Sequence, residues 1–279
     1  MTDKWIVHAV VFNQEHFLRP WVRNAVRYAD AVVVMFSDKP WGYNPRARDL
    51  FPPDATGEML TRLEKEYDTL HVVRGEWDNE TDERNEAVEL ARKLGGRYLL
   101  VVDTDEFFRA ADIQRAKQWL RDHPAPTYHM PHIQLIKKAH WAIETSEGLP
   151  RFQFAIDLQH DVRFADKRNF TTPEGHDVPR ELCCCYHFSY LLPEDKLREK
   201  LGSFGHSQEI RPDWLEKVWP AIGPGSRNFH PVWPEAWKRL FEIELPGEIV
   251  ADFADEEAWR ELLSEPSPPP SPWWRFRRR

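Results

Sequence analysis

The sequence predicts an α/β fold built on an open, mostly parallel sheet with helices on both faces. Apolar runs of strand length alternate with segments of helical periodicity through residues 5–102. Residues 98–102, Tyr-Leu-Leu-Val-Val, form a continuous apolar run, as expected of a central parallel strand covered on both faces. Two aspartates follow this run, at the strand end where open sheets of this kind gather their ligands.

The first expected strand is the apolar, β-branched run at residues 5–12, which ends in turn chemistry at Asn13 and Gln14. After it, apolar residues repeat at helical spacing, and further short apolar runs have strand length. These patterns predict, in order, a helix at 17–28, a strand at 31–36, a helix at 58–67 and a strand at 70–74. The alternation is typical of βαβ units and therefore of parallel pairing.

The strongest helix signal begins at Asn79, a residue type that caps helix N-termini. Acidic residues fill the first turn, where they interact favourably with the helix dipole, and Gly95-Gly96 ends the pattern. The inner face is apolar and consists of Ala87, Val88, Ala91 and Leu94. A helix is therefore expected between Asn79 and Gly95, directly before the strand at 98–102.

After residue 125 the pattern weakens, and aromatic-rich segments and many prolines follow. We expect one principal domain that consists of a regular half, residues 1–125, and an irregular half, residues 126–263. Helices in the second half are expected at residues 193–204, 212–218, 234–242 and 256–263. Residues 264–279 read as a proline-rich linker followed by a basic aromatic tail.

The composition is that of a soluble globular protein, since 41% of the 279 residues are hydrophobic and 30% are charged. No apolar run approaches the roughly 20 residues of a membrane span, and no signal-peptide pattern opens the chain, so secretion is not expected. The three adjacent cysteines at 183–185 cannot build a disulfide framework, which fits a reducing cytoplasm. The net charge is −8, and it is −12 without the four arginines of the tail, which disfavours a nucleic-acid groove.

Asp103 and Asp105 are the clearest candidates for chemistry. Their spacing in an extended chain turns both carboxylates to one side and Thr104 to the other. Mg²⁺ and Mn²⁺ prefer oxygen ligands, bind through one or two carboxylates and take the rest from phosphate and water. The pair therefore predicts a divalent-cation site that binds a diphosphate, with Glu106 as a further acceptor beside it. A solvated turn is the alternative for an isolated Asp-x-Asp motif, so the flanking sequence decides.

The flanking sequence resembles the core of the family 2-like glycosyltransferases, which have the GT-A fold. Arg84-Asn85-Glu86 on the expected helix, followed by the strand at 98–102 and Asp103-Thr104-Asp105, carries the resemblance. The opening Val11-Phe12-Asn13-Gln14-Glu15 is also similar to the first strand and the Asn-x-Glu turn of that family. The resemblance covers residues 5–110, apart from a poorly matching loop at 40–66.

The resemblance implies a nucleotide-diphosphate sugar as donor, a UDP-sugar in the first place, and Mn²⁺ or Mg²⁺ as metal. It implies that Asp105 is the principal metal ligand and that Asp103 contacts the ribose or, through water, the metal. The other implied donor-site residues are Phe12 and Asn13 near the nucleoside, Asp38 and Asp78 beside the base and ribose, and Arg84 facing the diphosphate. Residues 36–41 depart from the acidic, serine-rich turn of the family, which leaves the base open.

A third metal ligand is expected further along, where residues 181–190 are similar to a later segment of the same family. A histidine there can complete the metal site, so His187 is the candidate, and a core histidine is the alternative. On a strand, Cys183, Cys185 and His187 share one face, so a zinc site is a further alternative, although no convincing fourth ligand is present.

An inverting transfer needs a base that takes the proton of the acceptor hydroxyl, opposite the departing diphosphate. The candidates are Asp157, Asp161, Glu174, His176 and Asp177. We favour Glu174 and Asp177, because residues 171–177 are turn-like and can form a loop that contacts the acceptor. A solvated surface turn is the alternative.

The sequence thus predicts a metal-dependent glycosyltransferase that moves a sugar to an acceptor hydroxyl with inversion, with residues 1–125 on the donor side and 126–263 on the acceptor side. A saccharide, a lipid-linked sugar, a protein or a modified nucleic acid remain open as acceptors. The alternative is a non-catalytic nucleotide-sugar or glycan-binding module, tethered to a membrane or nucleic acid by its tail. The tryptophans and arginines of residues 273–279 suit peripheral membrane or polyanion contact, and a disordered tail is the alternative.

Overall fold

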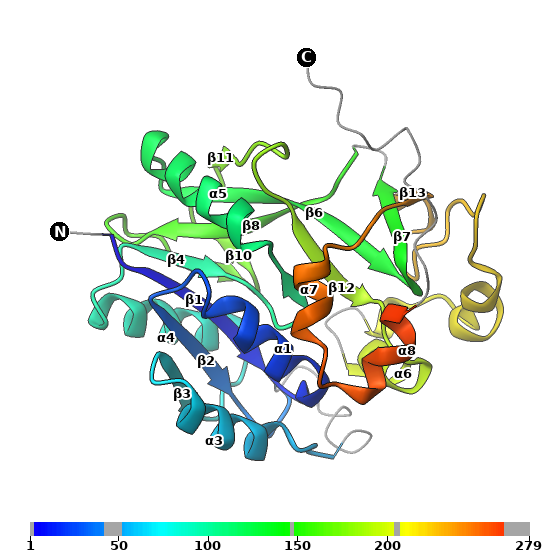
Figure 1. Cartoon of the computed structure of the whole chain (residues 1–279), viewed down its shortest axis with the longest axis horizontal. Helices are drawn as coiled ribbons and strands as arrows, with labels where there is room; N and C mark the ends of the chain where they lie inside the picture. The colour runs from blue at the N-terminus through cyan, green and yellow to red at the C-terminus, as the bar shows by residue number, and fades with distance from the viewer. Residues whose placement is uncertain (1–2, 42–51, 146–147, 204–206, 265–279) are drawn as a thin grey trace. The chain divides into compact units, whose positions relative to one another are not determined.

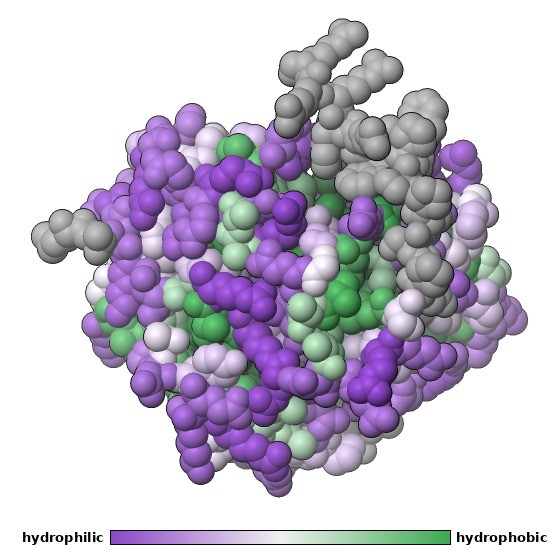
Figure 2. All heavy atoms as spheres, viewed as in Figure 1, coloured by the Kyte–Doolittle hydropathy of each residue, from purple (hydrophilic) through white to green (hydrophobic). Residues whose placement is uncertain are grey.

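A computed structural model of the chain describes residues 3–41, 52–145, 148–203 and 207–264, so the expected tail at 265–279 lies outside the described residues. The chain divides into two compact units, residues 1–131 with 151–185, and residues 132–150 with 186–279. Polar side chains cover most of the described surface on the face shown in Figure 2. Within the described ranges, no helix is both long and apolar enough to cross a membrane.

Four parallel strands form the central part of the first unit. They are β1 (Trp5–Val11), β2 (Ala31–Phe36), β3 (Leu70–Arg74) and β4 (Tyr98–Val101), in the order β3-β2-β1-β4 (Figure 1). Ile6 of β1 lies opposite Ala31 of β2 on one side and Leu99 of β4 on the other. The strand order therefore reverses between β1 and β4, and this switch point is where open α/β sheets bind ligands.

Helices cover both faces of these strands. They are α1 (Glu15–Ala25), α3 (Thr56–Glu66), α4 (Glu80–Lys93) and α5 (Ala110–Asp122). Successive strand residues point to opposite faces, and Ile6 and Leu99 pack with α4 in one buried cluster. On the opposite face, Trp5 stacks on Tyr98 and lies against Lys117 of α5. The predicted α/β class, with an open, mostly parallel sheet and helices on both faces, is confirmed.

Helix α4 begins and ends at the predicted caps. The Asn79 side chain accepts a hydrogen bond from the Asp82 backbone N–H at 2.9 Å. At the other end, Gly95 has a φ of +76°, a left-handed conformation that glycine adopts without steric cost. The helix expected between Asn79 and Gly95 is confirmed, and so are the other strands and helices expected before residue 103.

The first unit continues with antiparallel strands. β8 (Arg151–Asp157) is antiparallel to β4, β6 (Thr127–Ile136) is antiparallel to β8, and β11 (His176–Asp177) is parallel to β6. The short strands are β5 (Glu106–Phe107), β9 (Phe164–Asp166) and β10 (Asn169–Phe170), and the last two form a hairpin. Because β8 pairs directly with β4, residues 151–185 belong to this unit, which is larger than the half expected to end at residue 125.

In the second unit, β7 (Lys138–Thr145) is antiparallel both to the end of β6 and to β13 (Trp237–Glu242). The other regular elements are residues 186–190 of β12 (Cys185–Tyr190), α6 (Glu194–Ser203), α7 (Gly247–Asp252) and α8 (Glu257–Ser264). Short 3₁₀ or π turns lie at Ser207–Glu209, Trp214–Val218, Trp219–Ala221 and Pro234–Ala236. Phe188 packs against Phe253 and Trp259 in the core of this unit.

The helices expected at 193–204 and 256–263 are confirmed as α6 and α8. The helix expected at 234–242 is wrong, because only Pro234–Ala236 form a turn and Trp237–Glu242 form β13. β13 pairs with β7 from Trp237↔Thr145 to Glu242↔Trp141, so sheet pairing with a distant segment overrides the local spacing. Helices α5 and α7 lie where the sequence predicts no helix.

Replacing Asn79 tests the cap of α4. Asn79→Ala is expected to lower the free energy of unfolding by about 1 kcal/mol, because the backbone N–H of Asp82 loses its acceptor. Asn79→Ser keeps an acceptor oxygen and should lose less. Urea unfolding followed by circular dichroism measures both values. Equal losses in the two variants would show that this hydrogen bond does not stabilise the helix.

Candidate functional site

The candidate site lies at the switch point of the first unit, where the chain leaves β1 and β4. The turn after β1 contains Asn13, whose left-handed φ of +48° is a conformation that asparagine tolerates better than most residues. Next to it, the Gln14 side-chain oxygen accepts a hydrogen bond from the Thr104 hydroxyl at 3.3 Å. The sheet therefore brings the Asp-x-Asp motif and the Asn-x-Glu turn together.

The Asp103 carboxylate is bound between two arginines. Arg84 donates from Nη2 to Oδ1, and Arg168 donates from Nη1 to Oδ2, both at 2.9 Å. The Asp103 side chain is still 29% exposed. Burial opposes its ionisation, but Arg84 and Arg168 outweigh burial and lower the pKa of Asp103. Asp103 therefore carries a negative charge and retains lone pairs that can accept hydrogen bonds from a ligand.

Glu106 fixes the turn that presents Asp103. Its side chain is 1% exposed and accepts hydrogen bonds from Arg168 at 2.5 and 3.0 Å. It also accepts from the Asp103 backbone N–H at 3.1 Å, and its own N–H donates to the Asp103 carbonyl at 2.9 Å. Residues 103–106 are thus closed into a tight turn, and Glu106 acts as an internal acceptor.

The Arg-Asn-Glu segment of α4 connects this turn to the β9–β10 hairpin. Arg84 donates from Nε to Glu80 at 2.8 Å, in addition to its bond to Asp103. The Asn85 amide binds both backbone groups of Phe164, accepting from the N–H at 2.9 Å and donating to the carbonyl at 3.0 Å. One helix therefore holds both the carboxylate and the hairpin next to it.

Arg168 is the site residue that sequence reasoning misses. It lies in the turn between β9 and β10, after Lys167 with its left-handed φ of +49°. No periodicity or motif surrounds it, so the local sequence gives no signal. The only general clue is that buried acids such as Glu106 require a cationic partner.

Phe12, Asp38 and Asp78, which are expected to contact the nucleoside, follow the carboxyl ends of β1, β2 and β3. Because these strands are parallel to β4, the three residues lie on the same sheet edge as Asp103. Phe12 is half-buried, whereas Asp38 and Asp78 are exposed. Their contacts with a nucleotide stay predictions.

Asn13, the fourth expected nucleoside contact, is engaged within the protein. Its side-chain amide donates to the Pro52 carbonyl at 2.9 Å and accepts from the Asp54 N–H at 3.2 Å. These bonds hold the segment before α3 against the turn after β1. Asn13 thus shapes the rim of the site through its amide.

Arg84 is expected to face the diphosphate, but in the structure it lies in the interior. Its side chain is only 2% exposed, and its guanidinium lies 5.8 Å from the centre of the Phe164 ring. Nη1 has no hydrogen-bond partner among the described residues, and this atom is itself buried. In this structure Arg84 acts through Asp103 and does not present its charge at the surface.

The two aspartates differ in how well they fit a metal ion. Two guanidinium groups within hydrogen-bonding distance of Asp103 repel a divalent cation, so Asp103 does not fit as a direct ligand. Asp105 lies two residues further along, 8% exposed, and its negative charge acts on Asp103. A hard cation needs only one carboxylate when phosphate and water supply the rest. The residues therefore fit a metal held at Asp105.

His187, the expected third metal ligand, belongs to the second unit. Its ring centre lies 5.4 Å from that of His132 in a T-shaped contact. Cys183 and Cys185 belong to the first unit, and burial raises both thiol pKa values well above their usual range. Such thiols resist the thiolate form that zinc requires, and the role of His187 stays a prediction.

Glu174 and Asp177, the expected bases, are exposed and lie on the segment that pairs with β6 through β11. Asp177 forms an ion pair with Arg151 and lies 3.6 Å from His129 Nδ1. The Glu174 carbonyl accepts from the Thr127 hydroxyl at 3.1 Å, so this segment is attached to β6. Strands β8 and β6 separate β11 from β4, about 14 Å at the usual strand spacing. Their role as bases stays a prediction.

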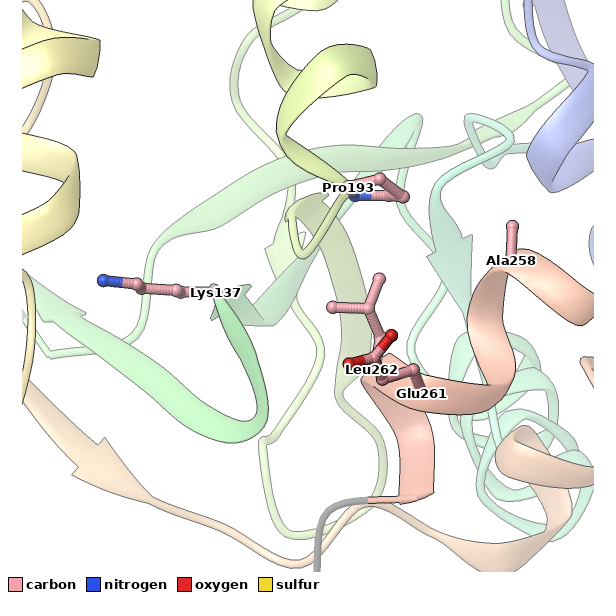
Figure 3. A pocket seen from close by; sticks show the side chains of 5 residues that line it. All are labelled: Lys137, Pro193, Ala258, Glu261 and Leu262. Carbon is pink, nitrogen blue, oxygen red and sulfur yellow. The ribbon is translucent and has the colours of Figure 1, made fainter.

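The second unit contains a cavity of about 300 Å³, lined by Lys137, Pro193, Ala258, Glu261 and Leu262 (Figure 3). In Figure 3, the Lys137 side chain points away from the other four. Its Nζ donates to backbone carbonyls of residues 219, 220 and 222, at 3.1, 2.9 and 3.3 Å. Among the lining residues, Glu261 is thus the polar side chain that remains for a ligand. One carboxylate does not form a catalytic cluster.

Comparison with known proteins gives matches of fold. No protein-family model and no curated protein matches the sequence. Residues 1–349 of S. aureus TarS match with 15% identity and a TM-score of 0.44, over 76% of this chain and 69% of that chain. A complex of the same TarS fragment with UDP-GlcNAc matches with 14% identity and a TM-score of 0.44, over 78% and 71%. The match covers 43% of the longer TarS structure.

A second solved match is the mannosyltransferase PcManGT from Pyrobaculum calidifontis, in complex with GDP-Man and Mn²⁺. It is 15% identical, with a TM-score of 0.39 over 56% of this chain and 45% of that chain. The expected GT-A class of fold is confirmed at the level of the sheet, whose parallel strands have the order β3-β2-β1-β4 with helices on both faces. These matches concern the fold and transfer no residue role to this chain.

Glu83, next to Arg84 on α4, is a buried carboxyl group whose pKa is raised to about 8. Burial is the main cause, because it disfavours the charged form, and a hydrogen bond from Trp41 Nε1 at 2.7 Å offsets it in part. Between about pH 4.5 and about pH 8, Glu83 therefore carries a proton in the folded protein but not in the unfolded chain.

This proton makes stability depend on pH. The raised pKa contributes stability that is complete below about pH 4.5 and is lost as pH rises through about 8. Glu83→Gln should remove this loss, which amounts to a few kcal/mol at about 1.4 kcal/mol per pKa unit. Urea unfolding at pH 5, 7 and 9 measures the free energy of unfolding of the parent and the variant.

Glu86→Gln is the matched control, since the exposed Glu86 also accepts a hydrogen bond from a tryptophan, Trp77, at 2.8 Å. An identical pH slope in Glu83→Gln and the parent would contradict the assignment.

Proposed function

We propose that this protein is a metal-dependent glycosyltransferase that moves a sugar from a nucleotide-diphosphate donor to an acceptor hydroxyl. The observation that carries the proposal is the ionised Asp103 carboxylate, fixed between two arginines beside Asp105 at the switch point of the sheet. Open α/β sheets bind nucleotides at this point. The resemblance of residues 5–110 to family 2-like glycosyltransferases supports the same function.

In this proposal the two aspartates have separate tasks. Asp103 accepts hydrogen bonds from hydroxyl groups of the ribose, because its charge is compensated by Arg84 and Arg168 and its remaining lone pairs suit O–H donors. Asp105 holds Mn²⁺ or Mg²⁺. When bound, such an ion neutralises the diphosphate and stabilises it as a leaving group.

The transfer requires an acceptor oxygen that attacks the anomeric carbon while the bond from that carbon to the diphosphate oxygen breaks. Attack from the opposite face inverts the configuration, and a base takes the hydroxyl proton. We propose a UDP-sugar as donor, with Glu174 or Asp177 as base and His187 as an additional metal ligand. We further propose a cytoplasmic location, in keeping with the three adjacent cysteines, and an uncharged acceptor, in keeping with the acidic composition.

Asp105→Asn tests the metal site. Manganese-dependent hydrolysis of the sugar donor should fall about a hundred-fold, because several kcal/mol of charge stabilisation are lost and each ten-fold in rate corresponds to about 1.4 kcal/mol. The thermal unfolding temperature should change little, since the substitution keeps the shape of the side chain. Asp68→Asn, at an exposed position after α3, is the control. Equal hydrolysis in Asp105→Asn and the parent would defeat the assignment.

A nucleotide panel tests the donor. UDP, GDP and TDP are titrated with and without Mn²⁺, and thermal unfolding is recorded. At least one diphosphate should raise the unfolding temperature only when Mn²⁺ is present, because a ligand that binds the folded state stabilises it. GDP is included because a matched mannosyltransferase structure holds GDP-Man. Stabilisation without metal, or by none of the three nucleotides, would count against the proposal.

A further inference from the structure

We infer that Arg168 is the positioning residue of the donor site, which holds the turn at residues 103–106 in place and does not itself contact the substrate. The inference rests on the proposed function, in which Asp103 and Asp105 bind the donor. It concerns a residue in the β9–β10 turn, far along the chain from the motif that it supports.

The Arg168 guanidinium makes five hydrogen bonds within the protein. Nη1 donates to Asp103 at 2.9 Å and to Glu106 at 2.5 Å. Nη2 donates to the second Glu106 oxygen and to the Val101 carbonyl, both at 3.0 Å. Nε donates to the Gln153 carbonyl at 3.1 Å. A guanidinium has five N–H donors, so no donor is left for a phosphate or a sugar.

These five bonds join the parts of the site that must keep a common geometry. Val101 is the last residue of β4, and Gln153 belongs to β8, so Arg168 connects two paired strands. Glu106 closes the turn at Asp103 from the inside. Through these contacts, Arg168 fixes the direction in which the turn presents its carboxylates.

The backbone of Arg168 is itself fixed on both sides. The Lys167 N–H donates to the Thr81 hydroxyl of α4 at 2.8 Å, and the Phe170 N–H donates to the Gln153 side chain at 2.5 Å. The Arg168 side chain is 17% exposed, and although burial works against the charged form, Glu106 and Asp103 keep the pKa of Arg168 raised. Arg168 is therefore a permanent cation held in one place.

The geometry also shows why lysine cannot replace Arg168. A lysine keeps the charge, but its three donors radiate from one nitrogen atom and cannot reach acceptors on both sides of a planar fork. Arg168→Lys thus separates geometry from charge. The matched control is Arg163→Lys in the same segment, because Arg163 forms an exposed ion pair with Glu89 of α4 at 2.8 Å.

The experiment compares the parent chain, Arg168→Lys and Arg163→Lys in two measurements. Hydrogen–deuterium exchange reports whether residues 101–107 remain protected, and this readout needs no substrate. Calorimetric titration with UDP and Mn²⁺, together with KM and kcat for hydrolysis of UDP-GlcNAc, reports the donor site. A purely structural role would lower the amount of folded enzyme, and hence the apparent kcat, without changing KM.

For Arg168→Lys, exchange in residues 101–107 should rise about ten-fold, and the Kd for UDP and the KM should rise about ten-fold to a hundred-fold, as for other residues that orient ligands. Arg163→Lys should match the parent. Parent-like exchange together with parent-like Kd and KM in Arg168→Lys would overturn the inference. If exchange rises but the parent binds no nucleotide, the positioning role is upheld and the proposed function fails.

Should Arg168→Lys not fold, Thr81→Ala carries the test, because it frees the Lys167 N–H and loosens the turn without touching Arg168. A rise in exchange at residues 101–107 and in the Kd for UDP, in a variant with the unfolding temperature of the parent, supports the inference. Unchanged values of both in folded Thr81→Ala contradict it.

Discussion

The compensation of two carboxylates, the partly exposed Asp103 and the buried Glu106, by Arg84 and Arg168 is the interaction on which the site depends. A buried charge without a partner costs several kcal/mol, so these side chains must meet whenever the first unit folds. They come from α4, from the turn after β4 and from the β9–β10 turn. The ion pairs therefore link helix, strand end and hairpin, and fix the turn that carries Asp105.

The parallel part of the first unit can be predicted from the sequence because its signals are local. Asn79 caps α4 through a side-chain oxygen that reaches a backbone N–H three residues later. The apolar run at β4 is buried on both faces, as a central strand must be. The position of Asp103 and Asp105 follows, since a strand end in the sequence is also an edge of the sheet.

The remaining structure depends on contacts between distant segments, which no short pattern encodes. β13 becomes a strand because β7 lies beside it, although its spacing suits a helix. β8 returns to β4 after a segment of the second unit, so no single boundary divides the chain. The sequence places Arg84 near the site, but the choice between a diphosphate and Asp103 as its partner depends on where the turn and Arg168 lie.

The arginines of the site are the reason why the proposed function includes a metal beside the diphosphate. Four carboxylates, those of Glu80, Asp103, Asp105 and Glu106, lie in one cluster with the guanidinium groups of Arg84 and Arg168. His8 stays neutral, because burial lowers its pKa to about 3 and the charges of Arg84 and Arg168 act in the same direction. Arg168 has no donor left, and Arg84 is buried. Neither guanidinium is therefore available to neutralise a diphosphate, and in the proposed function a divalent cation held at Asp105 takes that task.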